Sequence, residues 1–194
     1  MKKVIVFLVV LGLVSVANAT VVNFDDVYSG DGTKMIVSSY AGFDWNGGSG
    51  NFKIAKEGYA SYYTESARSD HWFAAAMGYE TRDIVRSDGG VFNFQGVWFS
   101  PANPSAAGFV EVRGMLDGTQ VGDTARIDLS GATPEWLACN FDGIDQLLFD
   151  GSDSTTGHAQ YYAFDDFTYT PVPEPATLVL LGLGGLLLRR RKSA

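Results

Sequence analysis

The sequence is short of cysteine, histidine and cationic residues, and each shortage excludes a class of site. Cys139 is the single cysteine, so no intramolecular disulfide can form, and its apolar surroundings predict a small buried side chain. His71 and His158 lie far apart and lack the spacing of zinc ligands. The chain also has no Gly-x-Ser-x-Gly elbow, no phosphate-binding glycine loop and no Cys–His pair. We therefore predict that it is not an enzyme.

The first 19 residues have the three parts of a secretory signal peptide. A short basic start precedes residues 4–14, which are apolar, and Ala17 and Ala19 supply the small residues that signal peptidase needs. We expect cleavage before Thr20, and therefore export. An uncleaved membrane anchor is the alternative, but the apolar run is short for a spanning helix.

The other end of the chain is a second apolar segment. Residues 176–188 carry no charge, and as a helix they would measure roughly 20 Å, less than the ~30 Å hydrocarbon core of a bilayer. Flanking residues or local thinning can close part of that gap. Four consecutive cations then stay on the cytoplasmic side of the inner membrane and stop transfer, namely Arg189, Arg190, Arg191 and Lys192. We predict a single apolar helix that holds the exported protein transiently in the membrane.

Pro173, Glu174 and Pro175 stand immediately before this helix. The two prolines favour extended backbone, the form in which a protease binds its substrate. The order of Pro-Glu-Pro, glycine-containing apolar helix and terminal basic cluster resembles the PEP-CTERM sorting signal. The resemblance implies recognition by exosortase, a membrane cysteine protease-transpeptidase, which removes the tail near the motif. It also implies delivery to the cell surface or exopolysaccharide matrix of a Gram-negative bacterium.

Between the two ends, residues 20–170 have the length of one domain, with residues 171–194 as the sorting segment. Six of the 14 Lys and Arg residues lie in the two ends, which leaves eight in the domain. Only one of the 22 Asp and Glu residues lies there, Glu174, so the domain has a net charge of −13. Such a charge excludes nucleic acid as a partner. The aromatic content, in contrast, predicts a folded core.

Alternating apolar and polar residues predict strands throughout the domain. The clearest runs are 92–99, 109–116, 125–129, 144–149 and 161–169. Asp117-Gly118 predicts a tight hairpin after the second of these runs. Gly, Asn, Asp and Ser clusters separate the strands at short intervals, which is typical of an all-β sandwich. Only residues 66–79 are compatible with a helical turn or two.

The last third of the domain resembles the jelly-roll bodies common among PEP-CTERM proteins, which look like distant relatives of carbohydrate-binding modules. In a jelly roll the first and last strands lie near each other. That arrangement would bring Asp25 and Asp26 close to the Phe164-Asp165-Asp166-Phe167 segment. The resemblance implies a structural Ca²⁺, with Asp25 or Asp26 and Asp165 as oxygen donors. Two solvated acidic turns are the alternative.

The tryptophans are the candidates for ligand contact, because sugar rings stack on exposed aromatic side chains. Trp45 precedes a glycine-rich loop and Trp72 lies in a polar stretch, so these two, with Tyr59, Tyr62 and Tyr63, are the candidates for an exposed site, and packing in the core is the alternative for each of them. Trp98 and Trp136 lie inside apolar patterns and are expected in the core.

Together these features predict an exported, non-catalytic surface or matrix protein that contacts exopolysaccharide through a β-sandwich. A structural protein of the matrix or biofilm, without a defined ligand pocket, is the alternative. A surface glycoside hydrolase ranks third, because the 21 acidic residues of the domain offer many carboxylate pairs and the sequence singles out none.

Overall fold

The computed structural model describes residues 18–27, 35–36, 39–45, 52–56, 72–76, 81–101, 108–130, 133–153 and 161–172. All regular structure in these ranges is β-strand, as the alternation of apolar residues predicts. The strands are β1 (Thr20–Val22), β2 (Met35–Ile36), β3 (Ser39–Tyr40), β4 (Phe43–Asp44), β5 (Phe52–Lys56), β6 (Trp72–Ala76), β7 (Arg82–Arg86), β8 (Phe92–Pro101), β9 (Gly108–Leu116), β10 (Thr119–Leu129), β11 (Glu135–Ile144), β12 (Gln146–Asp153) and β13 (Tyr162–Pro171).

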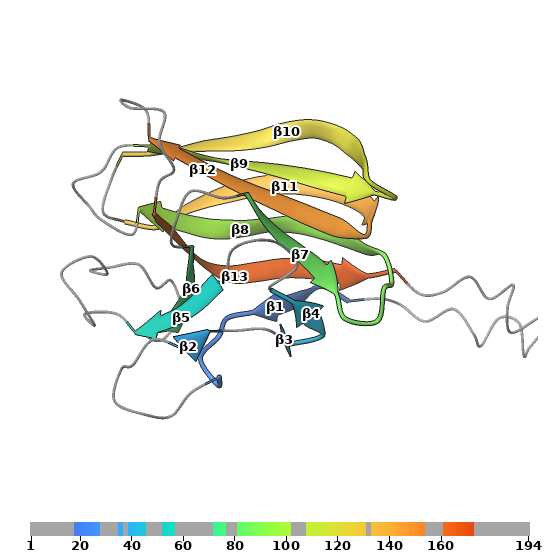
Figure 1. Cartoon of the computed structure of the whole chain (residues 1–194), viewed down its shortest axis with the longest axis horizontal. Coiled ribbons are helices and arrows are strands. Elements are labelled where there is room, and N and C mark those ends of the chain that lie inside the picture. The colour runs from blue at the N-terminus through green and yellow to red at the C-terminus, as the bar shows by residue number, and fades with distance from the viewer. Residues whose placement is uncertain are drawn as a thin grey trace, which may run out of the picture.

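The strands form two antiparallel sheets that pack face to face (Figure 1). The seven-stranded sheet has the order β11-β8-β13-β6-β5-β2, and β1 also pairs with β13. The six-stranded sheet has the order β10-β9-β12-β7-β4-β3. The prediction of an all-β sandwich is therefore confirmed.

The first and last strands are hydrogen-bonded neighbours. In the antiparallel register, Thr20 lies opposite Tyr169 and Val22 lies opposite Phe167. The expected closeness of these strands is confirmed, and both ends of the domain leave from the same end of the sandwich.

The local predictions hold for the longer strands. β9 and β10 form the predicted hairpin, in which Leu116 lies opposite Thr119 and the turn consists of Asp117 and Gly118. Both turn residues have positive φ, 49° and 74°, as a two-residue hairpin of this kind requires. The helical turn considered for residues 66–79 is wrong where the structure describes this stretch: residues 72–76 are β6, a strand buried on both faces.

The space between the sheets is filled largely by aromatic rings. Phe164 of β13 lies at the centre, with ring centroids 5.0 Å from Phe52, 5.4 Å from Phe149 and 5.8 Å from Phe24. Most of these pairs are edge-to-face, the arrangement that the ring quadrupoles favour. Each of these four rings is completely buried, so the aromatic residues that are abundant in the sequence form the core.

No helix within the described ranges is long and apolar enough to cross a membrane. The apolar helix predicted at 176–188 and most of the signal peptide lie outside these ranges. Ala19 is the last residue before β1, so the predicted signal peptidase site adjoins the first strand.

Candidate functional site

The two tryptophans expected at the surface are part of the core. Trp45 is completely buried, and its indole Nε1 donates a hydrogen bond to the carbonyl oxygen of Tyr40 at 2.9 Å. Its ring packs edge-on against Phe24, with centroids 5.2 Å apart. Trp72 is only 8% exposed. The exposed site considered for them from their polar neighbours is wrong, because Trp45, directly after β4, and Trp72 of β6 both belong to the core cluster. Tyr63 and the other two candidate tyrosines lie outside the described residues.

The tryptophans expected in the core instead form a pair on the outward face of the seven-stranded sheet. Trp98 of β8 and Trp136 of β11 are direct cross-strand partners. Their ring centroids are 5.8 Å apart and the rings are inclined by 59°. Trp136 is 39% exposed and Trp98 is partly buried. The core position predicted for Trp136 is therefore wrong.

Strand alternation explains why both rings point outward. On β11, Leu137 belongs to the core cluster, so its neighbour Trp136 projects from the opposite face. On β8, Val97 and Phe99 are completely buried and flank Trp98 in the same way. The sequence around both tryptophans is apolar because the neighbouring residues, and not the tryptophans, fill the core.

Gly96 lies beneath the exposed ring. A Cβ atom on Gly96 would approach Cζ2 of Trp136 to 2.6 Å and the carbonyl oxygen of Leu137 to 2.3 Å. Real Cβ atoms essentially never come so near, so only glycine lets the indole lie against the β8 backbone. This glycine holds Trp136 along the sheet surface, where one side of the ring remains open to solvent.

Uncharged polar groups continue the same face on β8 and β13. The Gln95 side-chain amide donates to Oγ1 of Thr170 at 3.1 Å, and Oδ1 of Asn93 accepts from the backbone of Gly143 at 2.8 Å. Asp165 is the β13 partner of Trp98, but it is completely buried. Strands β8, β11 and β13 contain no lysine or arginine. The face therefore combines two indole rings with amide and hydroxyl groups, without a positive charge.

The acidic segments proposed for calcium come near each other, because Val22 and Phe167 are paired. Asp26 accepts a hydrogen bond from the hydroxyl of Tyr40, and burial together with this hydrogen bond raises the pKa of that tyrosine. Asp165 accepts from the backbone N–H of Asp166 at 2.8 Å. In the part of the chain that the structure describes, no group of three or more His, Cys, Asp or Glu side chains is placed to hold a metal ion. The calcium site with Asp25, Asp26 and Asp165 stays a prediction.

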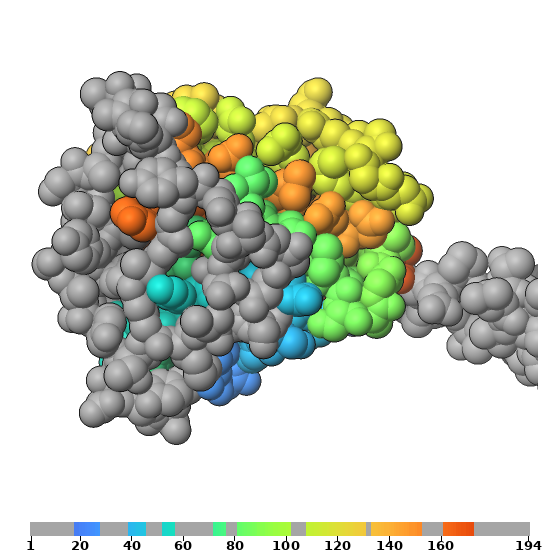
Figure 2. All heavy atoms as spheres, in the orientation of Figure 1, coloured from blue at the N-terminus to red at the C-terminus, as the bar shows by residue number. Residues whose placement is uncertain are grey.

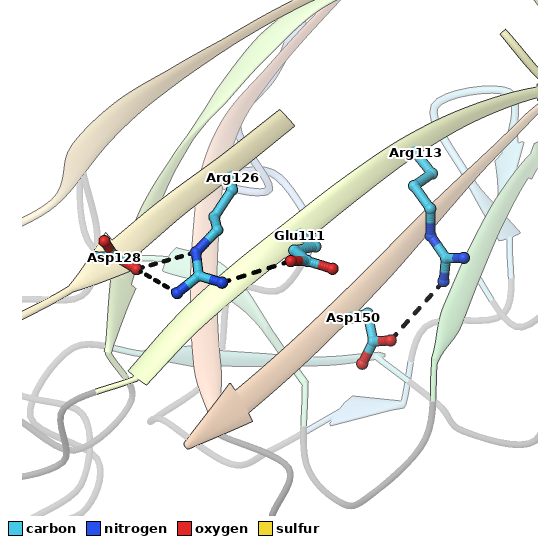
Figure 3. Close-up of polar contacts among 5 residues, drawn as sticks. All are labelled: Glu111, Arg113, Arg126, Asp128 and Asp150. Atoms are coloured by element: carbon cyan, nitrogen blue, oxygen red, sulfur yellow. Dashed lines mark hydrogen bonds and ion pairs between the residues drawn. The ribbon is translucent and has the colours of Figure 1, made fainter. Parts of the chain in front are cut away.

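The outward face of the six-stranded sheet has a different character. Figure 2 shows this face, with β9 and β10 in lime and yellow, β12 in orange and β7 in green. Arg126 stacks on the ring of Phe109, with its guanidinium carbon 3.6 Å from the ring centroid. It also contacts Glu111 at 3.6 Å and Asp128 at 2.9 Å (Figure 3).

A second ion pair continues this network, with 3.8 Å between the side chains of Arg113 and Asp150 (Figure 3). All four members of these two contacts across strands are at least partly exposed, so each pair contributes at most ~1 kcal/mol to stability. Arg113 and Arg126 are thus both paired with carboxylates of the same face. We therefore assign the face a role in sheet stability.

The kind of segment that follows β13 is identified by a comparison with known protein families. Residues 171–192 match the model of the PEP-CTERM protein-sorting motif. The chain carries a PEP-CTERM motif. The match includes the Pro173-Glu174-Pro175 segment and the basic cluster 189–192, as the sequence predicts, although both lie outside the described residues. The motif implies processing by exosortase, export and sorting to the cell surface.

Comparison with solved structures finds carbohydrate-active and phage proteins. The CBM22-1–GH10 modules of Clostridium thermocellum xylanase 10B, solved with xylohexaose, are 12% identical with a TM-score of 0.43. That match covers 82% of this chain and 28% of the xylanase chain, so less than a third of the xylanase is represented.

Two further matches have lower TM-scores. The enzymatically active domain of tailspike protein 4 from bacteriophage CBA120 has a TM-score of 0.32 and 14% identity, and covers 80% of this chain and 19% of that chain. The module CtCBM11 has a TM-score of 0.25 and 13% identity, and the match covers 84% of this chain and 93% of the CtCBM11 chain. No curated protein matches the chain.

Proposed function

We propose that the exported domain contacts exopolysaccharide through the outward face that carries Trp98 and Trp136, and that it has no catalytic activity. The observation that supports this role most directly is the exposed indole of Trp136, which lies beside the partly buried Trp98. Trp136 keeps more than a third of its surface in solvent, although burial of an indole is strongly favourable. An aromatic ring held open in this way, on a rigid sheet, is suited to stacking against the apolar face of a sugar ring.

The surroundings of the pair support a polar, uncharged ligand. Gln95, Thr168 and Thr170 lie on the neighbouring rows of the same face and offer amide and hydroxyl groups. Sugar hydroxyls are donors and acceptors at once, so such side chains bond them readily. In this proposal the two indole rings provide the apolar contact area for a sugar ring. The polar groups around them fix its orientation and determine which sugar binds.

We also infer that the sandwich is a jelly roll. Its last eight strands divide between the sheets as β6-β13-β8-β11 and β7-β12-β9-β10. A jelly roll has eight strands in two such sheets. This connectivity places the last strand inside one sheet, next to strands from the middle of the domain.

The absence of catalysis is part of the proposal. Glu111 and Asp150 are direct cross-strand partners on the six-stranded sheet and form the most obvious carboxylate pair. Each is within 4 Å of an arginine, Arg126 or Arg113. Both carboxylates are therefore engaged in surface ion pairs, and we assign them a structural role.

The test is affinity electrophoresis of the processed protein in gels that contain one polysaccharide each, including the exopolysaccharide of the host. We expect at least one gel to retard the protein and Trp136→Ala to abolish the retardation. Tyr161→Ala is the matched control, because Tyr161 is 47% exposed and equally aromatic but precedes β13, outside the pair. If no gel retards the folded protein, the role of a structural matrix protein without a ligand site replaces the proposal.

A further inference from the structure

The sorting motif and the folded domain overlap in the chain. The motif spans residues 171–192, yet its first residue, Pro171, is the last residue of β13 and lies opposite Phe92 of β8. The next residue, Val172, donates its backbone N–H to the carbonyl oxygen of Val91 at 3.2 Å. The sheet therefore holds the chain up to the residue before Pro173, without a linker between the domain and the Pro-Glu-Pro segment.

The end of β13 is held less firmly than the rest of the strand. Residues 162–164 lie between β8 and β6, and Thr168 and Tyr169 lie between β8 and β1. The pairing with β1 ends where Thr20 lies opposite Tyr169. For Thr170 and Pro171, the described residues provide a strand partner on the β8 side alone. Within the described residues, a side-chain hydrogen bond from Gln95 also holds Thr170.

This geometry places a steric demand on the processing enzyme. A protease binds several consecutive residues of extended chain on both sides of its target, and a folded sandwich one residue away would obstruct it. Release of Thr170–Val172 from β8 would free three residues, or about 10 Å of extended chain. The end of a strand that has one neighbour can separate from it locally at a low cost in free energy. The part of β13 between β1 and β8 can separate only when the sheet itself unfolds.

We propose that Thr170–Val172 is a detachable end of β13, which leaves β8 when exosortase binds the sorting motif, and that β1 limits the detachment at Tyr169. The three residues act as a linker during processing and as part of the sheet at other times. The domain thereby contributes to recognition, because exosortase contacts a segment that the sandwich itself holds.

The test fixes this end to β8 with a disulfide in the full-length precursor. Asn93 and Thr170 are direct Cα partners, and such antiparallel pairs have the Cα separation that a disulfide spans. We would make Asn93→Cys with Thr170→Cys in a Cys139→Ser background, so that only the new pair can form. Processing is followed over time by immunoblot in membranes that contain exosortase, with and without reductant.

We expect the oxidised precursor to be processed more than about tenfold more slowly than the same molecule after reduction. The two single-cysteine variants are the controls for the lost side chains and should show no effect of reductant. Equal processing of the oxidised and reduced forms would overturn the proposal.

Two further variants separate detachment from a general loss of recognition. Four residues, Gly-Ser-Gly-Ser, inserted after Val172 should restore processing of the oxidised precursor. They provide a flexible linker in place of Thr170–Val172, which the disulfide fixes to β8. Gln95→Leu should speed processing of the otherwise unchanged chain, because it removes the side-chain hydrogen bond to Thr170. If the insertion leaves the oxidised precursor unprocessed, the linker role is wrong.

Discussion

Trp98 and Trp136 face each other across β8 and β11 with ring centroids 5.8 Å apart, on the side of the sheet that does not contact the core. Trp45 and Trp72 occupy the core between the sheets. The four tryptophans therefore divide into one pair in the core and one pair on the outward face of the seven-stranded sheet. This division leads to a direct comparison of their contributions to stability.

Trp45→Ala and Trp136→Ala should differ strongly in the free energy of unfolding. Removal of the completely buried indole of Trp45 should cost about 3–5 kcal/mol, because it leaves a cavity and an unbonded carbonyl of Tyr40. Trp136→Ala should cost about 1 kcal/mol or less, since solvent already covers much of the ring. Urea denaturation followed by circular dichroism measures both. Equal losses would contradict the assignment of Trp136 to the surface.

Gly96→Ala should destabilise the pairing of β8 with β11. The new methyl group would meet both the Leu137 carbonyl and the Trp136 ring, so the strands must separate or the indole must move. A loss of about 1–3 kcal/mol is expected, with a change in the fluorescence of Trp136. Gly90→Ala is the control, because its Cβ would meet the side chain of exposed Asp88, which can move. A neutral Gly96→Ala would show that the ring does not rest on this glycine.

Cys139 should make stability fall at alkaline pH. Burial raises the pKa of its thiol from 9.0 to about 12, so the folded protein keeps a proton that the unfolded chain loses. The stabilisation is fully present below pH 9.0 and is lost as the pH rises toward about 12. Denaturation midpoints measured from pH 8 upward should therefore decline less in Cys139→Ala than in the parent chain. Parallel declines would contradict this assignment.

Calcium should stabilise the protein if Asp25, Asp26 and Asp165 hold it. A ligand present at about 100 times its dissociation constant adds ~2.7 kcal/mol to the free energy of unfolding. We expect EDTA to lower the thermal midpoint and added Ca²⁺ to restore it, and Asp25→Asn to reduce the response. Mg²⁺ at the same concentration is the control for ionic strength. A midpoint that EDTA leaves unchanged would remove this site from consideration.

The strands and the sandwich could be predicted because their signals are local. β9 and β12 alternate residue by residue, and the turn at Asp117-Gly118 requires the φ values that these residues adopt readily. The sorting motif could be predicted for the same reason, since its three parts are consecutive.

The candidate site could not be predicted, because it depends on which face of a strand points inward. Gly96 and Val97 are both buried, so the alternation along β8 shifts at this point and Trp98 turns outward. The pairing with β11 then places Trp136 beside it. Residues on the inward and on the outward face of such a strand have the same apolar neighbours in the sequence. Only the register between strands far apart in the chain distinguishes the exposed tryptophans from the buried ones.

The position of β13 also determines when this protein can fold. It is the last strand to be synthesised, yet it lies inside its sheet and bonds to β8, β6 and β1. Until residue 171 has crossed the membrane, β8 and β6 have an empty place between them and the aromatic core lacks Phe164 and Phe167. The native seven-stranded sheet therefore cannot be completed before residue 171 has been exported. Pro171, the first residue of the sorting motif, also ends this strand, so the sheet is completed only when export has reached the motif.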